Sequence, residues 1–277
     1  MPTKPKDERY EIDPVDGLPR ELVGEWVIDK HQRLRHYIDI SRAARRKFKG
    51  DATFIDLYCG TGRARISGTN EVVDGSALIA ASEATKRDPF GKIYIADLDS
   101  CNVSACLVRM NRAGLENIEA LEGPAEETAK TIASKLSQSG LHLAFLDPYN
   151  LMALPFSLIQ ALGKLSRMDL LIHFSMMDLQ RNVGSLMKSG RLDQFAPGWR
   201  EQIDPSSRND IKVQAVFHHW CELIKGLGYK DPTYQSELVR GARNQPLYRL
   251  VLASKSDIGT QFWGEVSNVT PQGRLQF

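Results

Sequence analysis

The sequence predicts an α/β protein built on a mostly parallel sheet, and three features lead to this class. Short apolar runs alternate with longer helix-like stretches between residues 53 and 174. A glycine turn follows the first apolar run in FIDLYCGTGRA, and two strand-like runs separated by GARNQP lie near the C-terminus. Crossover helices join parallel strands, whereas a tight turn joins antiparallel ones. We therefore expect the strand order 3-2-1-4-5-7-6, with only the seventh strand antiparallel.

Each expected element follows from local periodicity and turn signals. The strands are expected at residues 53–58, 92–96, 117–121, 141–146, 169–174, 234–240 and 247–253. The helices are expected at residues 22–48, 76–86, 100–113, 125–136, 155–165 and 211–227.

Four further segments complete the expected organisation. Residues 1–21, rich in proline and charge, are expected to form a loose arm before one domain at 22–256. Residues 257–277 would be a C-terminal tail. Residues 66–75 are expected to be an insertion. The polar stretch 176–210 shows no clear period and is too long for an ordinary loop, so it predicts a functional insertion.

Composition narrows the functional classes. The 277 residues include 42% hydrophobic ones, and no apolar run approaches the roughly 20 residues that cross a bilayer. The N-terminus, MPTKPKDERYEIDP, is polar, so we expect a soluble cytoplasmic protein without an export signal. The four cysteines, Cys59, Cys101, Cys106 and Cys221, lack zinc-like spacing, which favours free thiols and no metal.

The charge pattern leaves the question of nucleic acid open. A net charge of +2 is too small by itself to indicate phosphate binding. One run, RAARRKFK at residues 42–49, places five cations at the end of an expected helix. It is compatible with a solvated helix end, where cations stabilise the dipole, and with nucleic-acid contact.

The glycine turn is expected to hold a cofactor, because ligands of such sheets bind beyond the carboxyl ends of the strands. A dinucleotide loop would need a third glycine where Arg65 stands, and the lysine of a phosphate-binding P-loop is missing. Asp56, four residues before Gly60, suits a cationic ligand with an amino group. Gly60 and Gly62 would let the backbone approach it closely. These features favour S-adenosylmethionine.

Two later strand ends fit the same cofactor. KIYIADLDS ends at Asp97, whose carboxylate can accept both ribose hydroxyls, whereas Asp99 is expected to cap the next helix. LEGPAEE follows the third strand, where Pro124 and Ala125 would pack on the adenine. The expected cofactor-binding residues are Asp56, Tyr58, Gly60, Thr61, Gly62, Asp97, Leu98, Pro124 and Ala125.

The acceptor site is expected at LAFLDPYN, after the fourth strand. Asp147, Pro148 and Tyr149 resemble the D-P-P-Y signature of amino-group methyltransferases with one proline missing. Asp-Pro could equally turn the chain out of the sheet while Tyr149 packs locally. His218 and His219 are adjacent on an expected helix, point about 100° apart and are poor joint metal ligands.

Together these segments resemble the three-Cys-motif partner (TcmP) proteins, a methyltransferase-like bacterial family. The similarity covers most of the chain and runs through GEWVIDKHQRLRHYID, FIDLYCGTGRA, DGSALIA, LDPYNLMALPFSLIQAL, DLLIHFSMMDLQRN, PGWRE and ASKSDIGTQFWGEV. The resemblance implies a class I Rossmann-like methyltransferase fold and a partner protein with a three-cysteine motif. Tyr149 and Asn150 depart from the family's phenylalanine and glycine. DLYCG also resembles RNA uridine C5-methyltransferases, but their catalytic cysteine and D-P-P-R motif are missing.

Two functions remain open from the sequence. The first is S-adenosylmethionine-dependent methyl transfer to an amino nitrogen of a nucleic acid or a protein partner. Such transfer is an in-line displacement that depends mainly on positioning and needs few catalytic side chains. The second is a diverged binding module that docks a three-Cys-motif partner, which the departures at Pro124 and at the D-P-P-Y signature favour.

Overall fold

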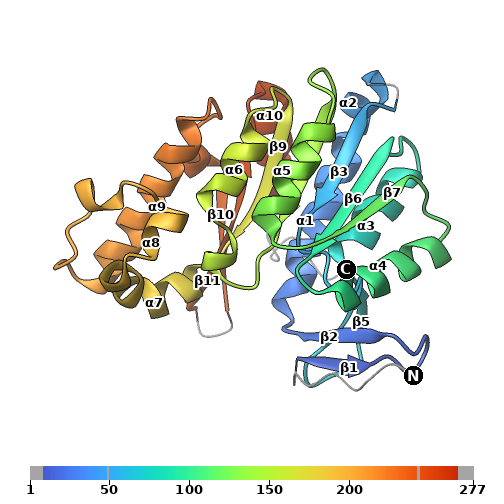
Figure 1. Ribbon diagram of the computed structural model, residues 1–277, viewed down its shortest axis with the longest axis horizontal. Helices are drawn as coiled ribbons and strands as arrows, with labels where there is room; N and C mark the ends of the chain where they lie inside the picture. The colour runs from blue at the N-terminus through green and yellow to red at the C-terminus, as the bar shows by residue number, and fades with distance from the viewer. Residues whose placement is uncertain (1–8, 49, 242–243, 268–277) are drawn as a thin grey trace, which may run out of the picture. The chain divides into compact units, whose positions relative to one another are not determined.

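The computed structural model describes residues 9–48, 50–241 and 244–267 (Figure 1). Its contacts divide the chain into two compact units. Unit 1 comprises Met1–Thr128 and Gly140–Phe145, and unit 2 comprises Ala129–Ser139 and Leu146–Phe277. No helix of the described ranges is long and apolar enough to cross a membrane.

The main sheet has seven strands in the order β10-β11-β9-β8-β3-β6-β7. Their bounds are Ala52–Asp56 (β3), Lys92–Asp97 (β6), Ile118–Glu122 (β7), Leu141–Leu146 (β8), Met168–Phe174 (β9), Ser236–Arg240 (β10) and Pro246–Ala253 (β11). Strand β11 is antiparallel to both of its neighbours. Read from the β7 edge, this is the predicted order 3-2-1-4-5-7-6. The topology of a Rossmann-like methyltransferase fold is thereby confirmed.

The burial of the central strand β3 explains why its apolar run was a clear strand signal in the sequence. Every residue of β3 is buried, and β3 pairs in parallel with β6 on one side and with β8 on the other. A strand that is covered on both faces reads as a continuous apolar run, which is what residues 52–56 show. Its last residue, Asp56, has Ile95 and Phe145 as register partners, so the loop after β3 begins between two strand ends.

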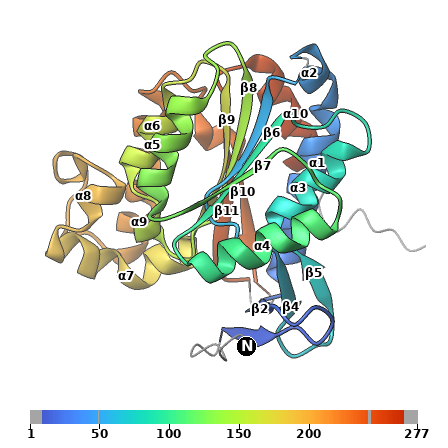
Figure 2. The ribbon, with the colours of Figure 1, turned by 45° about the vertical axis from the view of Figure 1, so that its right-hand side comes forward.

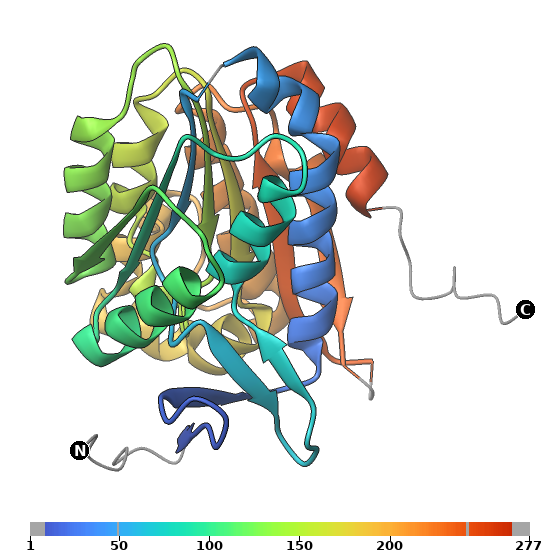
Figure 3. The same ribbon diagram turned by 90° about the vertical axis from the view of Figure 1, so that its right-hand side faces the viewer.

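The helices of unit 1 include α1 (Trp26–Ile40), α2 (Arg42–Lys47), α3 (Ser76–Thr85) and α4 (Ser100–Arg112). Helix α5 (Ala125–Lys135) begins in this unit and continues in unit 2. Helix α1 packs against α3 (Figure 3). The prediction of one helix over residues 22–48 was wrong: Leu22 lies in a strand, and the helix is interrupted at Ser41, whose hydroxyl donates to the carbonyl of Ile38.

A second, four-stranded sheet in unit 1 corrects the expectation of a loose arm at residues 1–21. Its order is β1-β2-β4-β5, with bounds Tyr10–Ile12, Pro19–Val23, Arg63–Ile66 and Val72–Asp74 (Figure 2). The expected insertion 66–75 is the turn and return strand of its β4–β5 hairpin. Strand β2 pairs in parallel with β4, so long-range pairing orders the N-terminal segment from Tyr10 onward. Residues 1–8 lie outside the described ranges.

Buried ion pairs attach this small sheet to α4. The guanidinium of Arg109 donates to both carboxylate oxygens of Asp16, at 2.7 and 2.9 Å, and its side chain is 1% exposed. Arg63 reaches Asp13 and Asp16 at 3.3 Å. Arg109 also donates to the carbonyls of Pro19 and Thr61, at 2.7 and 2.8 Å. One side chain therefore connects the N-terminal hairpin to the glycine turn.

Unit 2 contains α6 (Phe156–Gly163), α7 (Met176–Ser189), α8 (Leu192–Phe195), α9 (Asn209–Lys225) and α10 (Asp257–Ser267). Helix α7 shows that the start of the stretch 176–210 does have a clear period, contrary to the expectation, whereas a functional role of this stretch stays a prediction. Its buried residues Met176, Leu179, Val183, Leu186 and Met187 recur at helical spacing. The expected tail begins as helix α10, and residues 242–243 of the GARNQP turn and 268–277 of the tail lie outside the described ranges.

Candidate cofactor site

Three loops of unit 1 are tied together at the carboxyl ends of β3, β6 and β7. The N–H of Cys59 donates to the carbonyl of Ala96 at 2.9 Å, and that of Gly123 donates to the carbonyl of Asp97 at 3.1 Å. The N–H of Gly60 donates to the Asp97 carboxylate at 3.1 Å. The predicted loops are thus brought to one place, with Asp97 in contact with the other two.

The glycine turn has a backbone that only glycine adopts easily. Gly60 and Gly62 have φ values of 52° and 77°. A Cβ on Gly62 would lie 2.9 Å from a methyl of Leu78 and 3.0 Å from the Cα of Cys106. A Cβ on Gly60 would lie 2.1 Å from a carboxylate oxygen of Glu21. The turn therefore fits tightly between α3 and α4, and it lies directly against the N-terminal hairpin.

The structure places Asp56 inside the protein. This residue is 0% exposed. The Ser76 hydroxyl donates to one of its carboxylate oxygens at 2.5 Å, and the N–H of Tyr58 donates to the other at 3.1 Å. Asp56 thus holds the turn and the start of α3 in place. Direct contact with a ligand's amino group, which the sequence suggested, stays a prediction and would require one of these donors to share the carboxylate.

The Asp97 carboxylate accepts hydrogen bonds from three groups. Besides Gly60, its carboxylate accepts the N–H of Asp99 at 3.0 Å and the amide of Asn102 at 3.2 Å. Asn102 also lies 3.2 Å from the hydroxyl of Tyr10. The predicted capping role of Asp99 is confirmed, since its side chain accepts the N–H of Cys101 at 2.8 Å. Asp97 is therefore held by donors from its own loop, the glycine turn and α4.

Sequence reasoning did not select two residues of the N-terminal hairpin that reach this site: Glu21, which lies against Gly60, and Tyr10, which contacts Asn102. Burial raises the pKa of the Tyr10 hydroxyl; the hydrogen bond with Asn102 opposes this effect, and the charges of Glu21 and Asp97 add to it. These two carboxylates therefore give the rim of the turn a negative potential. The sequence signal was weak: residues 10–12 alternate between apolar and polar over three positions only, and residues 19–23 do not alternate, so neither segment could be distinguished from an irregular arm.

The other predicted residues divide into exposed and buried ones. Leu98, which follows Asp97, is 64% exposed, Pro124 is exposed and Ala125 is half-buried. Thr61 is 1% exposed, and its hydroxyl donates to the carbonyl of Arg63 at 2.7 Å. Leu98, Pro124 and Ala125 are thus accessible to a ligand, whereas Thr61 shapes the turn from within.

The predicted acceptor residues belong to unit 2. Oδ1 of Asp147 lies 3.4 Å from Nδ1 of His173, and the His173 ring packs against the Tyr248 ring in a tilted arrangement with centroids 4.5 Å apart. Tyr149 is 71% exposed, and the side chain of Asn150 caps the following 3₁₀ turn (Leu151–Ala153). Asp147 is thus fixed beside an imidazole, whereas the Tyr149 ring is accessible. His173 carried no sequence signal, since it lies within an apolar strand.

The thiols and histidines form no metal site in the part of the chain that the structure describes. All four cysteines are free, as expected. A hydrogen bond with the Cys106 thiol and burial raise the pKa of Cys59 far above its ordinary value, which makes it a poor nucleophile at neutral pH. Nε2 of His219 lies 2.8 Å from the carbonyl of Pro197, in keeping with a structural role.

Comparisons with known proteins give remote similarities. The chain matches no protein-family model and none of the curated proteins. Among solved structures it resembles the O-methyltransferase from Bacillus cereus in complex with SAH, with 15% identity, 82% of this chain and 80% of that chain covered, and a TM-score of 0.48. It also resembles the O-methyltransferase of tomaymycin synthesis from Streptomyces achromogenes in complex with SAM, with 17% identity, 82% of this chain and 80% of that chain covered, and a TM-score of 0.45. A third similar structure is an rRNA methylase from Streptococcus thermophilus, with 13% identity, 84% of this chain and 98% of that chain covered, and a TM-score of 0.40. The fold assignment rests on the strand order.

Proposed function

We propose that this protein is an S-adenosylmethionine-dependent methyltransferase that acts on an amino nitrogen of a nucleic acid or a protein partner. One observation carries the proposal: the Asp97 carboxylate directly joins the glycine turn after β3 to the loop after β6. In this topology a ligand binds beyond the carboxyl ends of the strands. The acids Asp97 and Glu21 at that place suit a cofactor that bears sulfonium and ammonium charges.

Each accessible group then has a role toward the cofactor. Asp97 would accept the ribose hydroxyls in charge-assisted hydrogen bonds, which are stronger than neutral ones. Glu21, which lies against Gly60, would accept a hydrogen bond from the ammonium group of the methionine moiety. Leu98, Pro124 and Ala125 would pack on the adenine, since their apolar surfaces are accessible. Asp56 and Tyr58 would support the turn, and Thr61 would do so from its buried side.

The proposed acceptor residues are Asp147, Pro148 and Tyr149. A conjugated amino group must become more tetrahedral before its lone pair attacks the methyl group. The Asp147 carboxylate and a backbone carbonyl of the Asp-Pro turn would each accept one hydrogen from the amino group and expose that lone pair. The exposed ring of Tyr149 would stack on the planar group, a contact worth about 1–3 kcal/mol for a nucleobase.

A binding module remains the second candidate. In this function the protein would dock a three-Cys-motif partner of the kind that the TcmP resemblance implies, with or without bound cofactor. Two observations favour it: Pro124 stands where many methyltransferases hold the adenine with an acid, and one proline of the D-P-P-Y signature is missing. Either function would place the protein in the cytoplasm, where its cofactor is made.

Native mass spectrometry and calorimetry test the cofactor first. We expect the purified protein to bind S-adenosylmethionine and its demethylated product, and not NAD. A preference for NAD would disprove the proposal. Transfer of a labelled methyl group to a purified three-Cys-motif protein or to RNA then separates the two candidates. Cofactor binding without transfer to either acceptor would favour the binding module.

A further inference from the structure

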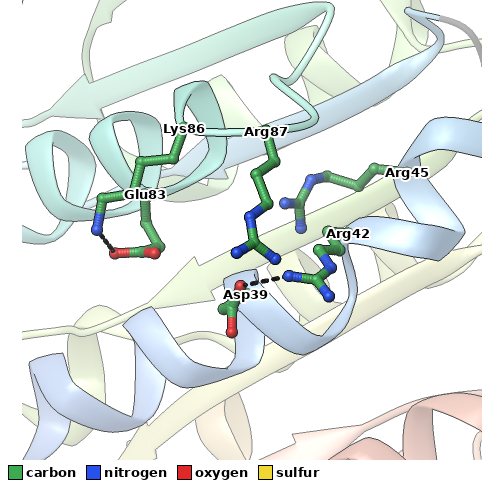
Figure 4. A pocket seen from close by; sticks show the side chains of 6 residues that line it. All are labelled: Asp39, Arg42, Arg45, Glu83, Lys86 and Arg87. Carbon is green, nitrogen blue, oxygen red and sulfur yellow. Dashed lines mark hydrogen bonds and ion pairs between the residues drawn. The ribbon is translucent and has the colours of Figure 1, made fainter.

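A cationic pocket lies in unit 1 at the amino ends of β3 and β6, opposite the cofactor loops. It has a volume of about 280 Å³. It is formed by the C-terminal end of α1, by α2 and by the end of α3 and the turn after it (Figures 1 and 4). All of its lining residues are charged: Asp39, Arg42, Arg45, Glu83, Lys86 and Arg87.

Arg45 forms the floor of this pocket. Its residue exposure is only 4%. Its guanidinium donates to the carbonyls of Asp88 and Ile38 and to the Ser41 hydroxyl, and it stacks over the ring of Phe90 at 4.9 Å. No carboxylate of the described residues forms an ion pair with it. Burial lowers the pKa of Arg45 to about 10, although the more distant acids Asp88, Asp39 and Glu83 oppose this shift. A buried cation that donates only to neutral groups keeps an uncompensated charge, so binding of an anion beside it is favourable.

Two further guanidinium groups point into the same space. Figure 4 shows the guanidinium groups of Arg42 and Arg87 pointing toward Asp39 on the side of the pocket where Arg45 lies, whereas Lys86 turns toward Glu83. Arg42 has one long contact, to Asp39 at 3.5 Å, and the Arg87 guanidinium has no hydrogen bond or ion pair within the described chain. Planar guanidinium groups match the oxygens of a phosphate in pairs. The geometry therefore fits one phosphate between Arg42 and Arg87, above Arg45.

The cations continue beyond the pocket. The side chains of Arg35 on α1 and Arg46 on α2 are 57% and 70% exposed, and they form only long ion pairs, with Glu83 at 3.8 Å and with Asp88 at 3.9 Å. Exposed cations spread over neighbouring helices suit the successive phosphates of a nucleic acid better than a single phosphate. A protein partner would need an apolar centre in its interface, and no apolar side chain lines this pocket.

We propose that the pocket of Arg42, Arg45 and Arg87 binds a backbone phosphate of a nucleic acid and that the cations beside it contact the neighbouring phosphates. This inference goes beyond the proposed function, because the binding requires neither cofactor nor methyl transfer. It also gives Arg42, Arg45 and Arg46 of the run RAARRKFK a role that the sequence left open.

Fluorescence anisotropy of the full chain, measured without cofactor, tests the proposal. The probe is a labelled single-stranded RNA of about 20 nucleotides, titrated over a range of salt concentrations. The double variant Arg42→Ala with Arg87→Ala should bind at least about tenfold more weakly. The slope of log affinity against log salt should fall by about 0.7, since the variant removes one single-strand phosphate contact and each such contact contributes about 0.7. Arg45 is left intact because it is buried.

The matched control is Arg112→Ala with Lys188→Ala, which removes the same charge from two exposed positions elsewhere. This variant should keep nearly full affinity and salt slope. Equal losses in both double variants would overturn the proposal, since they would show diffuse attraction. So would absence of RNA binding by the wild type, or binding only of inorganic phosphate or polyglutamate. Circular dichroism would verify that each variant folds, and cofactor affinity measured in parallel tests the methyltransferase assignment separately.

Discussion

The Asp97 carboxylate accepts the N–H of Gly60 at 3.1 Å, which links residues 37 positions apart in the sequence. Its other oxygen accepts the N–H of Asp99 and the amide of Asn102. A carboxylate held by several donors is fixed in orientation, so little ordering is left for a ligand to impose. The relationship makes Asp97 both a structural link of the turn and the best candidate for holding a ribose.

Asp97→Ala should weaken S-adenosylmethionine binding by at least about tenfold. Hydrogen bonds to a charged group contribute about 1.5–3 kcal/mol each, and one such bond is already worth a factor of ten. Calorimetry would measure the affinity. The matched control is Asp99→Ala, which removes the neighbouring acid and a helix cap worth about 1 kcal/mol but should leave binding nearly unchanged. Equal affinity of the wild type and the Asp97 variant would refute the ribose role.

Glu21→Gln should lower the affinities for S-adenosylmethionine and S-adenosylhomocysteine alike, by about fivefold or more. Both ligands carry the amino-acid ammonium from which Glu21 is proposed to accept a hydrogen bond. Adenosine, which lacks that part, should bind the variant and the wild type equally well. Competition against a fluorescent adenosine analogue would compare the three ligands. An equal loss for adenosine would mean that Glu21 supports the loop as a whole rather than the ammonium.

Gly62→Ala should lower the free energy of unfolding by roughly 1–3 kcal/mol, since a strained backbone and a core clash each cost energy in this range. Its φ is +77° and its new methyl group would meet Leu78 and Cys106. Gly68 is a matched control, with φ of +79° and open space around its Cβ position. Urea unfolding of both variants separates the two costs: equal destabilisation would show that the packing of the turn contributes nothing.

The N-terminal hairpin should lose stability in acid over a definite pH range. The hydrogen bond from Arg65 lowers the pKa of Glu11 from 4.5 to about 2, although burial opposes this effect. A pKa that is lower in the folded protein means that the unfolded chain binds the proton first. The stabilisation is therefore complete above about pH 4.5 and disappears as the pH falls toward about 2. Thermal unfolding of wild type and Glu11→Gln across this range should converge at low pH; curves that stay parallel would contradict the linkage.

The sequence predicted the main sheet well because its central strands are buried on both faces. An apolar run such as residues 52–56 has few alternatives. The sequence did not predict the small sheet, because strand β2 pairs with β4, about 40 residues away, and such short strands carry little periodicity of their own. It failed again at α7, where Arg181, Asn182 and other polar residues masked a regular buried stripe.

The residues of the candidate site likewise fall into those that local sequence predicts and those that depend on distant contacts. Gly60, Gly62 and Asp97 were predictable because a backbone turn and a strand end impose their residue types. Glu21, Tyr10 and Arg109 were not, because their roles depend on the docking of the hairpin. The burial of Asp56 follows from a contact with Ser76, 20 positions later, which no local pattern predicts.

Asp147→Ala should abolish methyl transfer while leaving the cofactor affinity within a few fold, because the residue is proposed to act on the acceptor. Its carboxylate lies 3.4 Å from the ring of His173, so the substitution removes a fixed acceptor of an amino hydrogen without opening a large cavity. Tyr149→Ala should instead weaken acceptor binding, and Tyr149→Phe should retain it, since stacking needs the ring and not the hydroxyl. Single-turnover transfer and calorimetry would separate chemistry from binding. If the Asp147 variant stayed fully active, or the methyl group were found on oxygen or carbon, the amino-nitrogen mechanism would be wrong even with the cofactor site intact.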